Sequence, residues 1–179
     1  AEVAQSNGDL AEEILSVEIP QRKGDNIVFD KDEHLRSGST IEGLKKLRPA
    51  FKENGSVTAG NSSGINDGSC ALIIASEEAA KKHGLTPKAR ILGLTAGGVP
   101  PRIMGIGPVP STNKLMSRLG LKMDDLDIIE LNEAFAAQGL AVLRELGIDD
   151  NDPRVNPQGG AIALGHPLGA SGARLVTTA

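Results

Sequence analysis

The amino-acid sequence predicts an α/β fold, in which β-strands and α-helices alternate along the chain. Short apolar runs of strand length are followed by segments whose apolar residues recur at helical spacing. Turns rich in glycine and proline separate these segments. Of the 179 residues, 39% are hydrophobic and 23% are charged, which is typical of a globular protein. Strands and helices of this length are expected to pack in layers.

The first part of the chain, up to residue 54, is polar and charged. Its expected elements are a helix end within 1–15 that stops near Asn7 and Gly8, extended segments at 17–19 and 27–29, and a helix after Thr40 with Ile41, Leu44 and Leu47 at helical spacing. It is also the most basic part, through Arg22, Lys23, Arg36, Lys45, Lys46, Arg48 and Lys52. On its own, this clustering indicates a solvated face.

The remainder of the chain alternates more regularly. The expected strands are 70–75, 90–95, 126–131 and 155–163, and the expected helices lie near 77–83, near 111–119, at 133–146 and after His166. Cys70 opens the apolar run 70–75, so we expect it to be a small buried hydrophobic residue in a strand, without a catalytic role.

Composition excludes several classes of function. The net charge of −4 and the scarcity of aromatic residues, three Phe and no Tyr or Trp, argue against binding to nucleic acid. A single cysteine excludes an internal disulfide and gives no set of zinc ligands, so no metal site is expected. No signal peptide or long apolar run is present, so we expect no membrane contact and a reducing, cytoplasmic setting.

Both ends of the sequence have an unusual form. The chain starts at Ala1 rather than at a methionine, and its last residues, 174–179, continue an apolar helical pattern without a glycine cap. We therefore expect that both ends are cuts through a larger protein.

The glycine-rich stretch 159–174 contains the most informative motif. Gly160 and Gly165 have the spacing of a phosphate-binding loop, but His166 and Pro167 stand where that loop requires Lys and Ser or Thr. The glycines do not fit the dinucleotide-binding fingerprint either. What remains is a histidine in a turn between a strand and a helix, where ligands of α/β proteins gather. Because histidine titrates near neutral pH, His166 is a candidate for acid–base chemistry.

Two further motifs are ambiguous on their own. Asn132 and Glu133 lie where a strand becomes a helix, and capping that helix explains both residue types. The segment 61–64, Asn-Ser-Ser-Gly, is by itself an ordinary turn.

Taken together, three blocks of sequence closely resemble the thiolases, the acetyl-CoA acyltransferases and acetyltransferases. These blocks are 57–68 (Val-Thr-Ala-Gly-Asn-Ser-Ser-Gly-Ile-Asn-Asp-Gly), 132–135 (Asn-Glu-Ala-Phe) and 165–174 (Gly-His-Pro-Leu-Gly-Ala-Ser-Gly-Ala-Arg). They occur in the family's order and spacing, and the resemblance covers essentially the whole chain. Residues 104–108 and 130–147 are most similar to the 3-oxoadipyl-CoA (β-ketoadipyl-CoA) branch.

The resemblance implies a thiolase-like fold, a mixed sheet with helices on both faces, present here as a truncated portion. Residues 1–53 would belong to the loop domain and its borders, 54–86 would close the N-terminal half, and 89–179 would form a truncated C-terminal half. The parent enzyme would be a homodimer or homotetramer that acts on small acyl-CoA molecules of fatty acid metabolism.

The resemblance also implies roles for individual residues. His166 is similar to the histidine that activates the nucleophilic cysteine and binds the thioester oxygen, and Asn132 to the residue that holds a water in an oxyanion hole. The family's contacts with coenzyme A, a substrate rather than a permanently bound cofactor, fall on Arg36, Phe51, Ala59, Ser63 and Phe135. At Gly43 some relatives have a serine, so one contact with the adenine would be absent.

The resemblance places both catalytic cysteines of the family outside this sequence, one before Ala1 and one after Ala179. The parent is therefore expected to be an acyl-CoA C-acyltransferase, and the alternative for the isolated chain is a catalytically inactive fragment. A second alternative, a nucleotide-hydrolysing module, lacks the required lysine.

Overall fold

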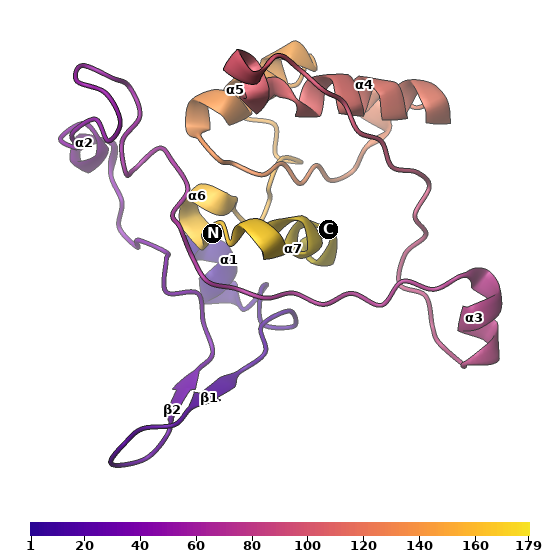
Figure 1. Ribbon diagram of the computed structural model, residues 1–179, viewed down its shortest axis with the longest axis horizontal. Coiled ribbons are helices and arrows are strands. Elements are labelled where there is room, and N and C mark those ends of the chain that lie inside the picture. The colour runs from indigo at the N-terminus through magenta and orange to yellow at the C-terminus, as the bar shows by residue number, and fades with distance from the viewer.

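The computed structural model describes residues 1–179, and it is mainly helical (Figure 1). Its helices are α1 (Glu2–Asn7), α2 (Ile41–Leu44), α3 (Glu77–Lys82), α4 (Pro108–Leu119), α5 (Ala136–Glu145), α6 (Ala161–Leu164) and α7 (Leu168–Thr178). Two 3₁₀ segments, η1 (Pro101–Ile106) and η2 (Met123–Asp125), flank α4. The strands β1 (Val17–Ile19) and β2 (Ile27–Phe29) form an antiparallel hairpin, which pairs Val17 with Phe29.

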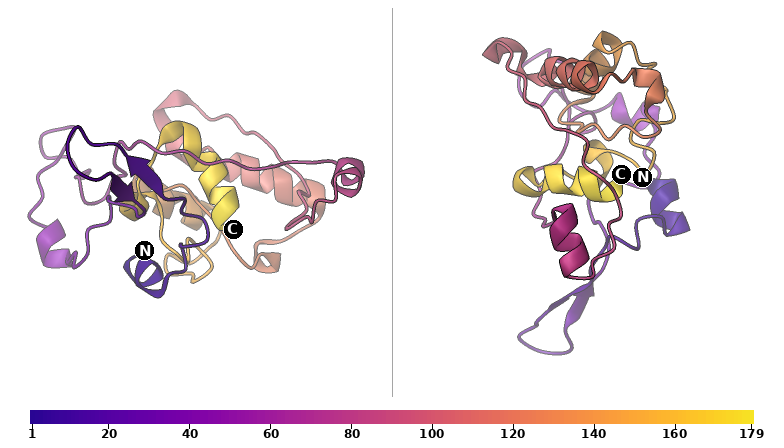
Figure 2. Two further views of the ribbon diagram at one scale, coloured as in Figure 1. Left: turned by 90° about the horizontal axis from the view of Figure 1, so that it is seen from below. Right: turned by 90° about the vertical axis from the view of Figure 1, so that its right-hand side faces the viewer.

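The helices α6 and α7 occupy the middle of the molecule (Figure 1). The pair α4 and α5 packs with η1 on one side of them. The β1–β2 hairpin and α3 project from this centre, each on extended chain (Figure 1 and Figure 2). The overall arrangement is therefore open. The structure contains no helix with the length and apolar character that spanning a bilayer requires.

Several predicted helices are confirmed, and their ends follow from local side chains. Gly8 ends α1 with a φ of 80°, a conformation that glycine adopts without steric cost. The hydroxyls of Thr40 and Ser76 accept hydrogen bonds from the backbone N–H of Gly43 and Ala79, and so cap α2 and α3. The helix expected near 111–119 begins earlier, at Pro108, because proline suits the first turn of a helix.

The predicted central strands are wrong as regular elements. Residues 70–75 and 90–95 are extended but unpaired, and Ile73 and Leu94 are more than four-fifths exposed. The segment 126–131 contributes a single parallel bridge, Ile129 with Val155. A regular strand forms only where a neighbouring segment pairs with its backbone N–H and C=O groups. This chain places no such neighbour beside 70–75 or 90–95.

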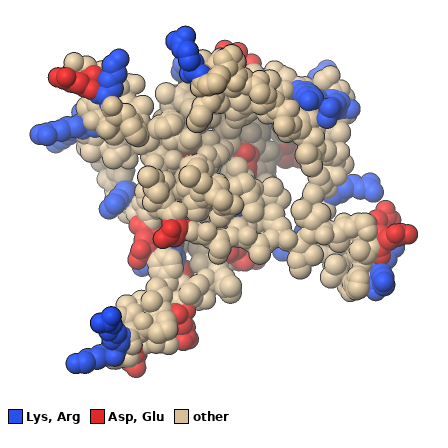
Figure 3. Space-filling model, viewed as in Figure 1, with Lys and Arg blue, Asp and Glu red and all other residues tan.

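The prediction of a strand at 155–163 is also wrong, because α6 begins at Ala161 and occupies the last three of these residues. The buried core is correspondingly small. Thirteen of 179 residues are buried, mainly where α5 meets α4 (Met116, Val142, Leu143 and Ile148) and at α6 and α7 (Ala161, Ala170 and Ser171). Most Lys and Arg side chains project from the periphery of the face in Figure 3, and a few acidic side chains show nearer its middle.

Candidate active site

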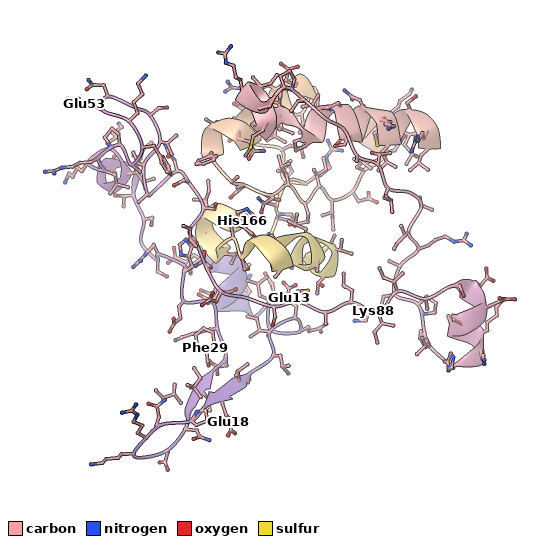
Figure 4. All side chains as sticks on the ribbon, in the orientation of Figure 1. Glu13, Glu18, Phe29, Glu53, Lys88 and His166 are labelled. Carbon is pink, nitrogen blue, oxygen red and sulfur yellow. The ribbon has the colours of Figure 1, made fainter.

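His166 lies in the short turn between α6 and α7, at the centre of the molecule (Figure 4). Gly165, immediately before it, has a φ of 103°, which a residue with a side chain rarely adopts. A Cβ atom at Gly165 would also lie 2.8 Å from the Asn66 side chain. The backbone N–H of His166 donates a hydrogen bond to Asn66 Oδ1 at 3.0 Å. The turn is therefore held by a residue 100 positions away.

The hydrogen-bond partners of the imidazole favour one tautomer. Nδ1 lies 2.6 Å from Ser171 Oγ, and this hydroxyl donates to the carbonyl oxygen of Pro167 at 3.1 Å. The Ser171 oxygen therefore accepts a hydrogen bond from Nδ1–H. On the other side of the ring, Nε2 faces Asn132 Nδ2 at 3.4 Å. An amide NH₂ only donates, so Nε2 presents its lone pair.

Asn132 has a different role from the helix cap that its sequence position allowed. The helix α5 begins at Ala136, and Phe135 is its N-cap, without a side-chain hydrogen bond. The Asn132 side chain points to His166 instead. Its Oδ1 is buried and accepts no hydrogen bond within the protein.

Two of the three sequence blocks are joined by backbone hydrogen bonds. Ser62 and Phe135 form an antiparallel bridge. The N–H and hydroxyl of Ser63 both donate to the carbonyl oxygen of Ala134, at 3.0 and 3.2 Å. The N–H of Ala136 donates to the carbonyl oxygen of Asn61 at 2.8 Å. The segment 61–63 thus lies directly beside the residues that follow Asn132.

Two of the expected coenzyme A contacts meet each other. The rings of Phe51 and Phe135 pack edge to face, with centroids 6.3 Å apart. Phe51 is nevertheless 76% exposed, so most of its surface is open to a ligand. Ala59, eight residues after Phe51, is exposed, and Arg36 is exposed in the connection between β2 and α2. No hydrogen bond links Arg36 or Ala59 to His166.

A hollow of about 610 Å³ adjoins the histidine. His166 and Asn132 lie at its polar side, and most of its other lining residues are hydrophobic, including Met104, Phe135 and Leu146. A pocket of this kind, apolar with a few converging polar groups, suits a small organic ligand. No group of three or more His, Cys, Asp or Glu side chains is placed to share a metal ion.

Arg174, in the middle of α7, pairs with the buried carboxylate of Glu130. Arg174 Nη1 lies 3.5 Å from Glu130 Oε2. Burial raises the pKa of Glu130 above its ordinary value, and the positive charge of Arg174 opposes this shift. Burial likewise raises the pKa of Asp32, and the positive charge of Arg174 again opposes the shift. The ion pair ties the segment before Asn132 to α7, the helix that follows His166.

Comparison with known proteins identifies the family. The family model described as "Thiolase, N-terminal domain" matches residues 1–78, and "Thiolase, C-terminal domain" matches residues 85–179. The chain belongs to the thiolase family.

Several known thiolases match this chain over its whole length or nearly so. The "Beta-ketoadipyl-CoA thiolase" of Pseudomonas putida is 64% identical over 179 residues, which are 100% of this chain and 44% of that protein. The crystal structure of the Bacillus anthracis acetyl-CoA acetyltransferase matches with a TM-score of 0.94 and 47% identity, over 99% of this chain and 44% of that one. Human mitochondrial 3-ketoacyl-CoA thiolase in complex with CoA gives 0.88 and 46%, over 99% and 43%. This chain thus spans less than half the length of these thiolases.

The similarity to solved thiolases accounts for the course of the unpaired segments. The backbone follows the path of a thiolase, so the α/β fold class predicted from the sequence is confirmed at the level of the family. The match covers only 44% of the solved thiolase chain. The segments 70–75 and 90–95 therefore follow the thiolase path, while more than half of that chain has no counterpart here to pair with them.

Cys70 differs from its prediction. It is half-buried rather than buried, it lies outside any strand, and its Sγ is 3.2 Å from Thr177 Oγ1. It lines a separate, open hollow with Gly68 and Pro167. The absence of sheet partners for 70–75 explains this exposure. The hollow that holds the His166 imidazole does not include Cys70.

Two residues that hold the histidine turn and its ring, Asn66 and Ser171, were not predicted from the sequence. Glu133 was predicted to favour a helix start, but its carboxylate accepts hydrogen bonds from Asn156 and Ile162. A signal existed for Ser171, because it lies one helical turn after Pro167, on the side of the helix that faces back to His166. No local pattern indicates that Asn66 reaches His166, since their hydrogen bond depends on the tertiary fold.

Proposed function

We propose that this chain supplies the histidine and asparagine of an acyl-CoA C-acyltransferase, a thiolase that cleaves 3-oxoacyl-CoA with coenzyme A or condenses acetyl-CoA units. The observation that carries the proposal is the position of Asn132 Nδ2 at 3.4 Å from His166 Nε2, beside an apolar hollow. The activity belongs to the whole thiolase, by which we mean a full-length enzyme that contains residues 1–179.

In this proposal, His166 exchanges a proton through Nε2. Its lone pair accepts the proton of the nucleophilic cysteine thiol, which leaves a thiolate that attacks the substrate carbonyl carbon. The imidazolium Nε2–H then donates a hydrogen bond to the substrate thioester oxygen as negative charge develops there. Ser171 keeps Nδ1 protonated throughout. Asn132 holds a water that serves as a second donor, and its unpaired Oδ1 supports this role.

The coenzyme A contacts form the next part of the proposal. Phe51, Ser63 and Phe135 line the pantetheine channel with Ala59, and Arg36 meets the nucleotide end. The ring contact of Phe51 with Phe135 and the pairing of Ser63 with Ala134 support a single surface for three of these residues. We also propose the division into a loop-domain part (1–53), the end of the N-terminal half (54–86) and the C-terminal half (89–179).

The proposed substrate class rests on the similarity to the Pseudomonas putida protein described above. We propose that the whole thiolase acts on 3-oxoadipyl-CoA or a similar 3-oxoacyl-CoA, because the chain is 64% identical to a protein with that name. A cytoplasmic, homo-oligomeric enzyme without a permanently bound cofactor completes the proposal.

A second candidate concerns the isolated chain, which we propose is catalytically inactive. The supporting observation is that its only thiol, Cys70, does not line the hollow of His166. Thiolysis of acetoacetyl-CoA and of 3-oxoadipyl-CoA, measured with the isolated chain and with the whole thiolase, tests both candidates. The whole thiolase should cleave one or both substrates, and the isolated chain neither. Cleavage by the isolated chain would refute its inactivity, and an inert whole thiolase would refute the enzyme function.

A further inference from the structure

Glu133 makes contacts that the acid–base chemistry does not require. Its Oε2 accepts a hydrogen bond from the backbone N–H of Ile162 at 3.2 Å, and its Oε1 accepts one from Asn156 Nδ2 at 3.2 Å. It does not lie in the first turn of a helix, because α5 begins at Ala136. The carboxylate instead reaches from the residue after Asn132 to the first turn of α6.

The packing around this carboxylate leaves no room for a side chain at Gly160. The N-cap of α6 is Gly160, which provides no side-chain acceptor for the free N–H groups of the first turn. A Cβ atom added at Gly160 would overlap the Glu133 carboxyl group. The φ of Gly160 is −110°, which alanine adopts readily, so this overlap is the main obstacle to a larger residue.

Asn156 holds the chain on both sides of Asn132. Its Oδ1 accepts from the N–H of Leu131 at 2.8 Å, and its Nδ2 donates to the carbonyl oxygen of Leu131 at 2.9 Å. The same Nδ2 donates to Glu133 Oε1. Residues 131 and 133 are thus both tied to Asn156, and residue 133 is also tied to α6, which ends two residues before His166.

We propose that Glu133 is a positioning residue that holds the Asn132 amide against His166 Nε2, through its two hydrogen bonds to Asn156 and Ile162. This inference rests on the proposed function and goes beyond it by assigning the spacing of the two site residues to a third. Both partners of the carboxylate are donors, so two acceptor oxygens are needed. Glutamine offers one acceptor oxygen and one NH₂, and it can satisfy only one of the two partners.

The test uses the whole thiolase with Glu133→Ala, Glu133→Gln, Gly160→Ala and the double variant Glu133→Ala/Gly160→Ala. We expect Glu133→Ala and Gly160→Ala each to lower kcat by about tenfold to a hundredfold, the scale of a small misplacement of site groups. The KM for coenzyme A should change less than about twofold, since neither residue touches the proposed channel. Glu133→Gln should fall between wild type and Glu133→Ala.

The double variant separates positioning from general damage. Without the carboxylate, the methyl group at residue 160 has space, so the double variant should be no slower than Glu133→Ala alone. Gly98→Ala is the matched control, because a Cβ atom there meets nothing within 4 Å, and it should match wild type. Losses that multiply in the double variant, or a rise in KM with kcat unchanged, would overturn the inference.

A spectroscopic measurement decides the same question without turnover. In ¹⁵N-labelled protein, the His166 Nε2 signal should shift in Glu133→Ala and in Gly160→Ala, and stay in place in Gly98→Ala. An unchanged Nε2 signal in both single variants would refute the positioning role. If the whole thiolase lacks thiolysis activity, the proposed function fails, while this signal still tests Glu133.

Discussion

Asn66 Oδ1 accepts a hydrogen bond from the backbone N–H of His166 at 3.0 Å, and the Asn66 Nδ2 lies 3.3 Å from His34 Nδ1. One side chain therefore joins the segment 61–68 to the histidine turn and to the loop before α2. The thiolase blocks lie far apart in sequence, and this side chain is one of the few direct links between them.

Replacement of Asn66 should loosen the histidine turn. Asn66→Ala removes the acceptor of the His166 N–H, and we expect a loss of about 1–2 kcal/mol in unfolding free energy for a half-buried hydrogen bond. Asn66→Asp keeps an acceptor for His166 and should lose less. Urea unfolding of the whole thiolase measures both. Equal losses of unfolding free energy in the two variants would show that the hydrogen bond from the His166 N–H to residue 66 does not stabilise the fold.

Ser171 should set the proton position on His166. Ser171→Ala removes the acceptor of Nδ1–H, so a larger share of the imidazole carries its proton on Nε2, where it cannot accept the thiol proton. We expect kcat to fall by about tenfold or more, and Ser171→Thr, which keeps a hydroxyl, to recover part of it. The ¹⁵N signals of the ring report the tautomer directly. A ring that keeps its Nδ1 proton in Ser171→Ala would contradict this account.

The sequence predicted the helices, the hairpin segments and the family well, because these depend on local spacing and motifs. Thr40, Ser76 and Gly8 lie where helix caps are expected, and the structure uses them so. The strand predictions for 70–75 and 90–95 failed, because a strand needs neighbouring segments that its own residues do not specify. The prediction for Glu133 also failed. Its sequence position suits the start of a helix, but the tertiary fold brings its carboxylate to the first turn of α6 instead.

The acid behaviour of Asp152 gives a prediction outside the site. Hydrogen bonds from the side chain and backbone of Arg154 lower the pKa of Asp152 from 3.8 to about 2. A lowered pKa means that the ionised form stabilises the folded chain above about pH 4, and that this contribution is lost as the pH falls toward 2. Arg154 also donates to the carbonyl oxygens of Met123 and Leu126, so the pair secures η2.

Carboxyl ¹³C titration of the folded chain measures this pKa. Arg154→Ala should move the midpoint of Asp152 upward, toward 3.8. Arg144→Ala is the control, because Arg144 pairs with Asp150 instead, and it should leave Asp152 unchanged. The same midpoint in wild type and Arg154→Ala would refute the assigned cause.

Cys70 should react without taking part in catalysis. Because the thiol is half-buried and outside a strand, iodoacetamide should label it in the folded chain without denaturant. Coenzyme A should not protect it, since its hollow is separate from that of His166. In the whole thiolase, Cys70→Ala should leave kcat within about twofold. Protection by coenzyme A would place Cys70 in the site.

The proton-transfer role of His166 is the central claim, and the kcat of a His166→Ala variant of the whole thiolase tests it most directly. The loss of a positioned acid–base group should lower kcat by at least about a hundredfold. His83→Ala is the matched control, because His83 only ends the projecting helix α3, and it should retain the wild-type kcat. A His166→Ala variant that is folded and turns over within about threefold of the His83→Ala control would contradict the account.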